Sequence, residues 1–523
     1  MSKKLTNPII TGFNPDPVIF RDDEKYYIVV STFEWLPGIR VYSSTNLYEW
    51  HYETSILTDS TLINLRGNPR GGSIWGPFAT YHNGKYYVVY TNTNSTTVPY
   101  KDVDNYIIWA DNIHGPWSQP TYINSSGFDP SIFFDTDGKA YFLNEIWDYR
   151  IPSRNKSCGI VMQEIDPISF CLLGRPKLIF KGTEAKKTEA PQIYKHGNFY
   201  YLLVAEGGTE QNHQETVARS KNVWGPYEVD PQTPLITAKD SKESVLQSTG
   251  HSSLVPNKNG DWYIAYLCTR PLYADKAILG RETALQQVNW TDDGWLRLSN
   301  GSHRPDLYLP NHLEIGPAFR RSHSFTDPLN NGITPKYWNT LRQFLNSSWA
   351  VSDSTGLTIK GGQSPQSNFD QHLIATRQCD FKATVSVEMD YTADTYLQLA
   401  GITLYLDTQN YLLFMVTVTD QGLPCVTLQK SEKGNFSIIK NVLINRQSHF
   451  KFKIELNYEK ASLILYADQN KIDLGQQDIS FLSGGFTGNF IGLDVIDMYQ
   501  RNSSYAHFSN FSYMDHDLSL IHI

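Results

Sequence analysis

Cysteine is scarce in this sequence. The 523 residues include only five cysteines, and neither their odd number nor their spacing suits a disulfide framework or a metal site. We therefore interpret them as reduced cysteines of a cytosolic protein. They are scattered along the chain, at Cys158, Cys171, Cys268, Cys379 and Cys425.

Long apolar runs and an excess of positive charge are also missing. No stretch approaches the roughly 20 apolar residues that a membrane-spanning helix needs. The opening MSKKLTNPII has no apolar run of the kind found in secretory signals. The net charge of −8 would repel nucleic acids and anionic membranes. We expect a cytoplasmic protein that binds neither.

Aromatic residues, in contrast, are abundant. They make up 13% of the chain and include 32 tyrosines and 12 tryptophans. Two interpretations are open, because all-β structure favours these residues and because flat rings on a surface also stack on the faces of sugars. The length of the chain suggests two or three domains.

The first half of the chain contains an internal repeat. Five segments share an apolar strand, a turn and a second strand, and their starts are 60, 53, 61 and 61 residues apart. Turns such as Asn83-Gly84 and Asn259-Gly260 between two apolar runs are strong hairpin signals. The segments are DPVIFRDDEKYY from 16, GPFATYHNGKYYVVYT from 76, DPSIFFDTDGKAYFL from 129, APQIYKHGNFYYLLV from 190 and HSSLVPNKNGDWYIAYL from 251.

Most of these units continue with another strand and a turn, as at Gly115-Pro116-Trp117 and Gly225-Pro226-Tyr227. Four strands per unit, repeated five times, indicate a five-bladed β-propeller. The alternative is a β-sandwich with accidental internal similarity.

The second half lacks the repeat and alternates instead. Residues 381–389 (FKATVSVEM) and 450–456 (FKFKIEL) place apolar and polar side chains on opposite faces, as in antiparallel sandwiches with one buried face. We therefore predict an all-β chain, with a propeller over 1–310, a linker at 311–324 and a β-sandwich over 325–523.

Propellers bind ligands at the axis, where the innermost strands converge. The equivalent positions of the five units are Asp16, Gly76, Asp129, Ala190 and His251, and Glu189 stands directly before Ala190. Taken singly, these residues suit a turn, a solvated charge or a buried histidine. The repeat places three carboxyl groups and an imidazole around one axis, where like charges would cost stability.

Two carboxyl groups on either side of a bond are the equipment of glycoside hydrolysis. One is protonated and donates to the leaving oxygen, while the other is ionised and activates water or attacks the sugar. A third acid can keep the pKa of the donor high and its geometry fixed.

The sequence resembles glycoside hydrolase family 43, most closely its two-domain β-xylosidases. The resemblance spans both halves and implies a propeller followed by a jelly-roll, concanavalin-like sandwich. The matching stretches, in order, are GFNPDPVIFR, STFEWLPG, GGSIWGPF, GFDPSIFFD, TEAPQIY, AEGGTEQNH, STGHSSLV, LGRET, GGFTGNFIGLDV and AHFSNFSY.

The resemblance implies hydrolysis with inversion and gives each acid a role. Asp16 of NPDP corresponds to the general base, Glu189 of the TEAP motif to the general acid, and Asp129 of FDPS to the residue that tunes the pKa of the acid. The motifs WGPF, EAP and GHSS depart from the usual family pattern, which leaves the sugar preference open.

Further residues match the substrate pocket of such enzymes. Phe33 and Trp75 would form a wall against the sugar, and Arg281 would bind its hydroxyls. Phe486 of the sandwich would close the pocket. The residues that would line the rest of it are Glu206, Asn212, His213 and His251.

The expected activity is release of xylose from the non-reducing end of β-1,4-xylo-oligosaccharides. The alternatives are α-L-arabinofuranosidase activity, a non-catalytic sugar-binding propeller, and a retaining hydrolase whose carboxyl groups would be about 5 Å apart rather than about 6.5–9.5 Å. No cofactor is required, although a structural or activating Ca²⁺ near His251, bound through water, is compatible with the resemblance. We also expect a homo-oligomer.

Asp16 stands between Pro15 and Pro17. A residue before proline favours extended backbone, and proline itself has a fixed φ. We therefore expect residues 14–17 to be stiff and extended, which would limit the drift of the Asp16 carboxylate.

Overall fold

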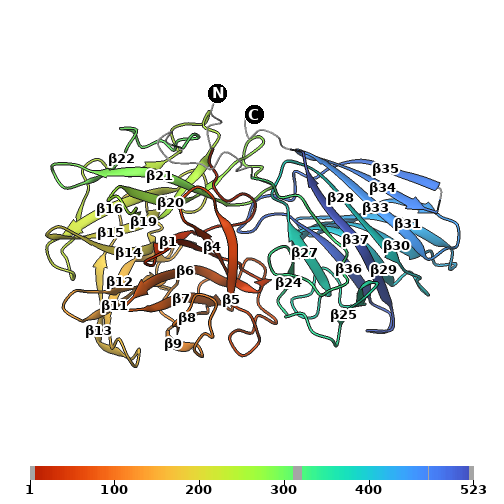
Figure 1. Cartoon of the computed structure of the whole chain (residues 1–523), viewed down its shortest axis with the longest axis horizontal. Coiled ribbons are helices and arrows are strands. Elements are labelled where there is room, and N and C mark those ends of the chain that lie inside the picture. Colours follow the sequence, from red (N-terminus) through yellow and green to blue (C-terminus); the bar gives the residue numbers. More distant parts are fainter. Residues whose placement is uncertain (1–5, 310–320, 469, 517–523) are drawn as a thin grey trace.

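The computed structural model of this chain describes residues 6–309, 321–468 and 470–516. Within these ranges the regular secondary structure consists of β-strands, and there is no helix long and apolar enough to cross a membrane. Two β-rich bodies lie side by side, with the first half of the chain in one and the second half in the other (Figure 1).

Five antiparallel sheets in the first body form the blades of a propeller, each with at least four strands in chain order. The five-bladed prediction is therefore confirmed. The first two blades are β1 (Val18–Arg21), β2 (Tyr26–Val30), β4 (Gly38–Ser44) and β5 (His51–Leu57), then β6 (Ser73–His82), β7 (Lys85–Thr93), β8 (Val103–Ala110) and β9 (Thr121–Asn124). The third is β10 (Ser131–Phe134), β11 (Ala140–Trp147), β12 (Ser157–Ile165) and β13 (Leu172–Phe180).

The last two blades follow the same plan, with one short extra strand in the fourth. They are β14 (Glu189–His196), β15 (Phe199–Glu206), β16 (Gln214–Ser220), β17 (Glu228–Val229) and β18 (Ile236–Thr237), then β19 (Gln247–Pro256), β20 (Trp262–Thr269), β21 (Glu282–Trp290) and β22 (Leu296–Leu298).

The predicted hairpin turns join the inner strands of the blades. His82 of β6 pairs with Lys85 of β7, so Asn83 and Gly84 form a two-residue turn. Their φ angles of 49° and 79° are both positive, as this kind of hairpin turn requires.

The residues before β1 close the ring of blades. The backbones of Ile10 and Thr283 exchange hydrogen bonds, and the side-chain amide of Asn7 bonds both backbone groups of Leu285. The N-terminal segment is therefore tied to β21 of the fifth blade. At the axis, the Ser253 hydroxyl accepts from the Ile19 amide and donates to the Pro17 carbonyl, which joins β19 to β1.

The position that defines the repeat has the same backbone conformation in all five blades. Its residues have φ angles between 41° and 55°, which is the left-handed region. They are Asp16, Gly76, Asp129, Ala190 and His251. The extended conformation predicted for Asp16 is therefore wrong: its φ of 55° shows that blade geometry overrides the bias imposed by Pro17. Such φ values are uncommon outside glycine and cluster at functional sites.

The second body is a two-sheet β-sandwich. One sheet contains β23 (Phe325–Asp327), β25 (Ala350–Asp353), β26 (Gly356–Lys360), β28 (Lys382–Asp390), β33 (His449–Asn457), β34 (Lys460–Ala467), β35 (Asn470–Asp478) and β37 (Tyr505–Asp515). The other contains β24 (Asn339–Leu341), β27 (Leu373–Arg377), β29 (Gln398–Asp407), β30 (Asn410–Val418), β31 (Pro424–Glu432), β32 (Asn435–Leu443) and β36 (Phe490–Asp497). Burial alternates along β28 and β33, as the sequence pattern predicts.

The two bodies share a sheet. A short strand of the first blade, β3 (Trp35–Leu36), pairs with β24 and becomes an edge strand of the sandwich. Trp35 is buried and stacks on Phe490 of β36, with ring centroids 3.7 Å apart. The sequence does not reveal this strand exchange. The predicted linker at 311–324 lies mostly outside the described residues.

Trp35 should therefore stabilise the docking of the two bodies. We expect Trp35→Ala to lower the free energy of unfolding by about 3–5 kcal/mol, because it leaves a cavity where a large ring was buried. Chemical denaturation measures this loss. Phe436→Ala is the control, since Phe436 is an aromatic residue of β32 that is 52% exposed. Equal losses in the two variants would contradict the role given to Trp35.

Candidate active site

A cavity of about 240 Å³ lies where the inner ends of the blades meet the sandwich. All five blades and one loop of the sandwich contribute residues to it. Eight of the predicted site residues line it together: Asp16, Phe33, Trp75, Asp129, Glu189, His251, Arg281 and Phe486.

Asp16 is held by an arginine that also reaches the sandwich. Nη1 of Arg281 donates to Oδ1 of Asp16 over 2.6 Å, while Nε and Nη2 donate to the carbonyl oxygen of Phe486 over 3.2 and 3.0 Å. Nδ1 of His251 lies 3.6 Å from the same carboxylate oxygen. Burial alone would raise the pKa of Asp16, but Arg281 and His251 outweigh it and lower that pKa. Asp16 is therefore kept ionised.

Glu189 has the opposite electrostatic environment. Burial and the neighbouring Glu145 raise its pKa to about 7, against the effect of Lys101. The pKa of Asp129 is also raised well above its usual value, by burial and by the charges of Glu189 and Asp16. Because like charges in a buried site cannot all be ionised cheaply, this group of acids retains a proton near neutral pH.

Two titratable residues that affect this site were not predicted: Lys101 lines the cavity, and Glu145 lies near Glu189 without lining it. Glu145 of β11 is fully buried, and burial raises its pKa to about 8. Lys101 places its Nζ 3.8 Å from the ring centroid of Trp147, 4.5 Å from that of Phe128 and 5.0 Å from that of Trp75. Neither occupies the repeated position. An acid inside the apolar run AYFLNEIW is a signal that could have revealed Glu145.

Gly76 explains why blade two contributes no side chain at the repeated position. A Cβ atom on Gly76 would lie 2.2 Å from Oδ1 of Asp129. Its φ of 41° also favours glycine. The missing side chain in one blade therefore makes room for the carboxylate of the next.

Three aromatic rings form one wall of the cavity. The rings of Phe33 and Phe486 are nearly parallel, with an interplanar angle of 15° and centroids 5.9 Å apart. Trp75 lies 6.2 Å from Phe33 and 5.8 Å from Phe486, between centroids. Because Phe486 belongs to the sandwich, the second domain completes a wall that the propeller begins. Such a wall suits the flat face of a sugar ring.

Three predicted pocket residues lie outside this cavity. The Glu206 carboxylate is fully buried and accepts hydrogen bonds from the hydroxyls of three threonines, Thr183, Thr188 and Thr216. His213 is also buried, with Nδ1 3.0 Å from the carbonyl oxygen of Ser248, and Asn212 is exposed. The residues of this segment that line the cavity are instead Gly208, Thr209 and Glu210.

The described residues include no cluster of three or more His, Cys, Asp or Glu side chains able to hold a metal ion. Around His251, the Asp16 carboxylate is already bound by Arg281. The side chains there do not form the oxygen-rich cage that Ca²⁺ prefers.

Two family models match this architecture. The model described as glycosyl hydrolases family 43 matches residues 5–296, and the model described as the β-xylosidase C-terminal concanavalin A-like domain matches residues 327–514. The chain belongs to glycoside hydrolase family 43.

Relatives of this family 43 hydrolase match along its whole length. A β-xylosidase of Bacillus subtilis is 35% identical, over 98% of this chain and 100% of its own. A xylosidase/arabinosidase of Humicola insolens is also 35% identical, over 95% of both chains. The crystal structure of a xylan β-1,4-xylosidase of Bacillus halodurans is 37% identical, with a TM-score of 0.94, over 98% of this chain and 100% of its own.

The Gly76–Asp129 contact can be tested in this hydrolase. We expect Gly76→Ala to lower kcat/KM by about 100-fold or more, because the added methyl group must displace the Asp129 carboxylate by an ångström or so. The measurement is hydrolysis of an aryl glycoside that the native enzyme cleaves.

Gly84→Ala is a matched control. Gly84 also has a positive φ, of 79°, but an added Cβ there would meet nothing within 4 Å. It should cost some stability through backbone strain alone and leave kcat/KM unchanged. If both variants lost activity equally, backbone strain and not the lost space beside Asp129 would be the cause.

Proposed function

We propose that this enzyme removes single xylose units from the non-reducing end of β-1,4-xylo-oligosaccharides with inversion at the anomeric carbon. The observation that carries the proposal is the contrast between two carboxyl groups of one cavity. The pKa of Asp16 is lowered, whereas that of Glu189 is raised to about 7. One carboxyl group is thus prepared to accept a proton and the other to donate one.

In the proposed reaction, Glu189 donates its proton to the glycosidic oxygen as the C1–O bond breaks. Asp16 accepts a proton from a water molecule on the opposite face of the sugar, and the oxygen of that water forms the new bond to C1. The product leaves as the inverted anomer. Solvent then returns a proton to Glu189 and takes one from Asp16.

Asp129 is proposed as the residue that tunes the general acid. Its own carboxyl group lines the same cavity as Glu189, and burial together with the charge of Glu189 raises its pKa. Lys101 limits this effect by placing a positive charge among the acids. The balance would keep Glu189 protonated and able to donate near neutral pH.

Two further observations support the choice of substrate. The cavity is small, and the ring of Phe486 closes it with Phe33 and Trp75, which suits a single terminal sugar. The relatives from B. subtilis and B. halodurans are named as xylosidases.

The roles of the two acids can be separated by leaving-group chemistry. We expect Glu189→Gln to slow xylobiose hydrolysis by about 10²- to 10⁴-fold, but to slow dinitrophenyl β-xyloside much less, because that leaving group needs no proton. Asp16→Asn should slow both, because water activation is needed in each case. Proton NMR of the first-formed anomer tests inversion, and first appearance of β-xylose would exclude it.

The pH profile should respond to the charges around Glu189. Activity requires protonated Glu189, so kcat/KM falls as pH rises through its pKa of about 7. Glu145→Gln removes a negative charge that raises this pKa and should move the basic limb to lower pH. Lys101→Met removes a positive charge that lowers it and should move the limb to higher pH.

The acidic limb of the same profile is an internal control. It reports the ionisation of Asp16, whose pKa is governed by burial, Arg281 and His251, so it should stay in place in both variants. A basic limb that moved in the same direction in both variants would contradict the assignment to Glu189.

α-L-Arabinofuranosidase activity is the second candidate function, since the H. insolens relative is named for both activities. The rates on aryl β-xyloside and aryl α-L-arabinofuranoside decide between them. We expect a higher kcat/KM on the xyloside, and a higher value on the arabinoside would reverse the order of the two candidates.

A further inference from the structure

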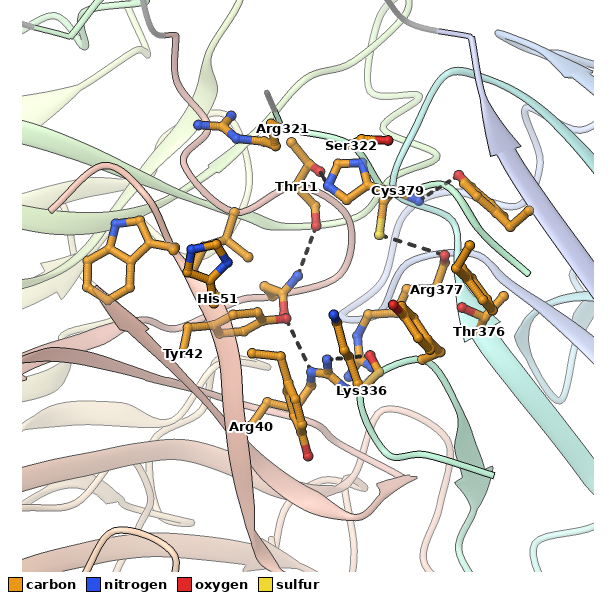
Figure 2. A pocket seen from close by; sticks show the side chains of 18 of the residues that line it. Thr11, Arg40, Tyr42, His51, Arg321, Ser322, Lys336, Thr376, Arg377 and Cys379 are labelled. Atoms are coloured by element: carbon orange, nitrogen blue, oxygen red, sulfur yellow. Dashed lines mark hydrogen bonds between the residues drawn. The ribbon is translucent and has the colours of Figure 1, made fainter. Parts of the chain in front are cut away.

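A second cavity, of about 290 Å³, lies between the propeller and the sandwich and shares no lining residue with the candidate active site. Figure 2 shows it from close by, with side chains entering it from both bodies. The propeller contributes residues such as Arg40 and Tyr42 of β4 and Thr11 of the N-terminal segment. The second half of the chain contributes Lys336 and Arg377.

The permanently charged side chains that line this cavity are all cationic. Four cationic residues line it, and the lining includes no Asp or Glu side chain. The cations are Arg40, Arg321, Lys336 and Arg377. All four are labelled in Figure 2, with Arg40, Lys336 and Arg377 closer to one another than to Arg321.

Two of these arginines differ from the other buried arginines of the described chain. Arg40 and Arg377 are only 4% and 6% exposed, and no ion pair with a described carboxylate satisfies either. The remaining three buried arginines each pair with an acid: Arg270 with Glu282, Arg281 with Asp16 and Arg342 with Glu34. The two exceptions both line this one cavity.

The groups that Arg40 and Arg377 do contact are neutral. Arg40 donates to the carbonyl oxygens of Pro335 and Lys336 and to the Tyr42 hydroxyl. Arg377 donates to the Phe13 carbonyl oxygen and the Asn339 side chain. Its Nη2 is buried without a hydrogen-bond partner among the described residues. Burial and the nearby Arg40 lower the pKa of Arg377 to about 9.

Burying a cation without a counter-charge is costly, so the arrangement calls for a negative ligand. We propose that this interdomain cavity binds a small oxyanion, a phosphate or a carboxylate, between Arg40, Arg377 and Lys336. Guanidinium groups match the paired oxygens of both anions. The volume leaves room for a small organic body beside the anionic group.

The ligand would join the two bodies. Arg40 belongs to the first blade, whereas Arg377 ends β27 in the sandwich sheet that β3 also joins. An anion held by both would add to the docking that brings Phe486 to the candidate active site. Ligands that bind only the folded, docked chain stabilise it by mass action.

Thermal unfolding of the full chain tests the proposal with defined probes. Sodium phosphate and sodium glucuronate are titrated separately at constant ionic strength, with sodium chloride as the balancing salt. We expect at least one oxyanion to raise Tm in a saturable manner, whereas chloride does not. The two arms distinguish a phosphate site from a sugar-carboxylate site.

Lys336→Gln shows whether the effect arises in this cavity. Lys336 is exposed, and its Nζ lies 5.0 Å from the ring centroid of Tyr337 with no hydrogen bond or ion pair to a described residue, so the variant should fold. It should weaken the apparent affinity for the oxyanion by about tenfold, equivalent to losing one charge-assisted contact. Lys242→Gln is the matched control: it removes the same charge from an exposed loop residue that does not line the cavity, and it should leave the affinity unchanged.

Two results would overturn the proposal. One is the absence of a saturable rise in Tm with either oxyanion. The other is a rise of equal midpoint in the native protein, Lys336→Gln and Lys242→Gln, which would place the anion elsewhere. Isothermal titration calorimetry with the oxyanion that raises Tm gives the same comparison without heating the protein.

Discussion

The hydrogen bonds that the Arg281 guanidinium makes to both Asp16 and Phe486 are the interaction on which the rest of the site depends. One nitrogen bonds the Asp16 carboxylate, and two others bond the carbonyl oxygen of Phe486. The same guanidinium therefore keeps the proposed base ionised and ties it to the sandwich. Because Phe486 also lies beside Phe33 and Trp75, one residue connects the ionised Asp16 to the aromatic wall. The sandwich is thus part of the pocket and not an appendage to it.

The propeller supplies what that interaction needs, by repeating one backbone feature. Each blade has a residue of left-handed φ at or near the start of its inner strand. Three blades place an acid at or beside this position and one places a histidine. The remaining blade has Gly76, where any side chain would collide with Asp129. A common local conformation, filled differently in each blade, converts five similar hairpins into one asymmetric site.

Charge is distributed unequally between the two functional regions. In the candidate active site, buried acids exceed the available cations, and burial together with the neighbouring Glu145 raises the pKa of Glu189 to about 7. In the interdomain cavity the imbalance is reversed, because Arg40 and Arg377 are buried without a carboxylate. Both regions lie against the same domain boundary. The docking of the two bodies therefore borders two cavities of different character, one rich in buried acids and the other in buried arginines.

The sequence by itself determined the blade count, the hairpin turns, the alternation of the sandwich strands and the gathering of Asp16, Asp129 and Glu189, because these follow from local patterns repeated along the chain. Tertiary structure alone decided the rest. Contacts between segments far apart in the sequence decide four features. They are the left-handed backbone at Asp16, the pairing of β3 with the sandwich, the position of Glu206 outside the cavity, and the placement of Lys101 and Glu145. Local propensity does not encode such contacts, since they depend on which side chains the closed ring and the docked sandwich finally bury together.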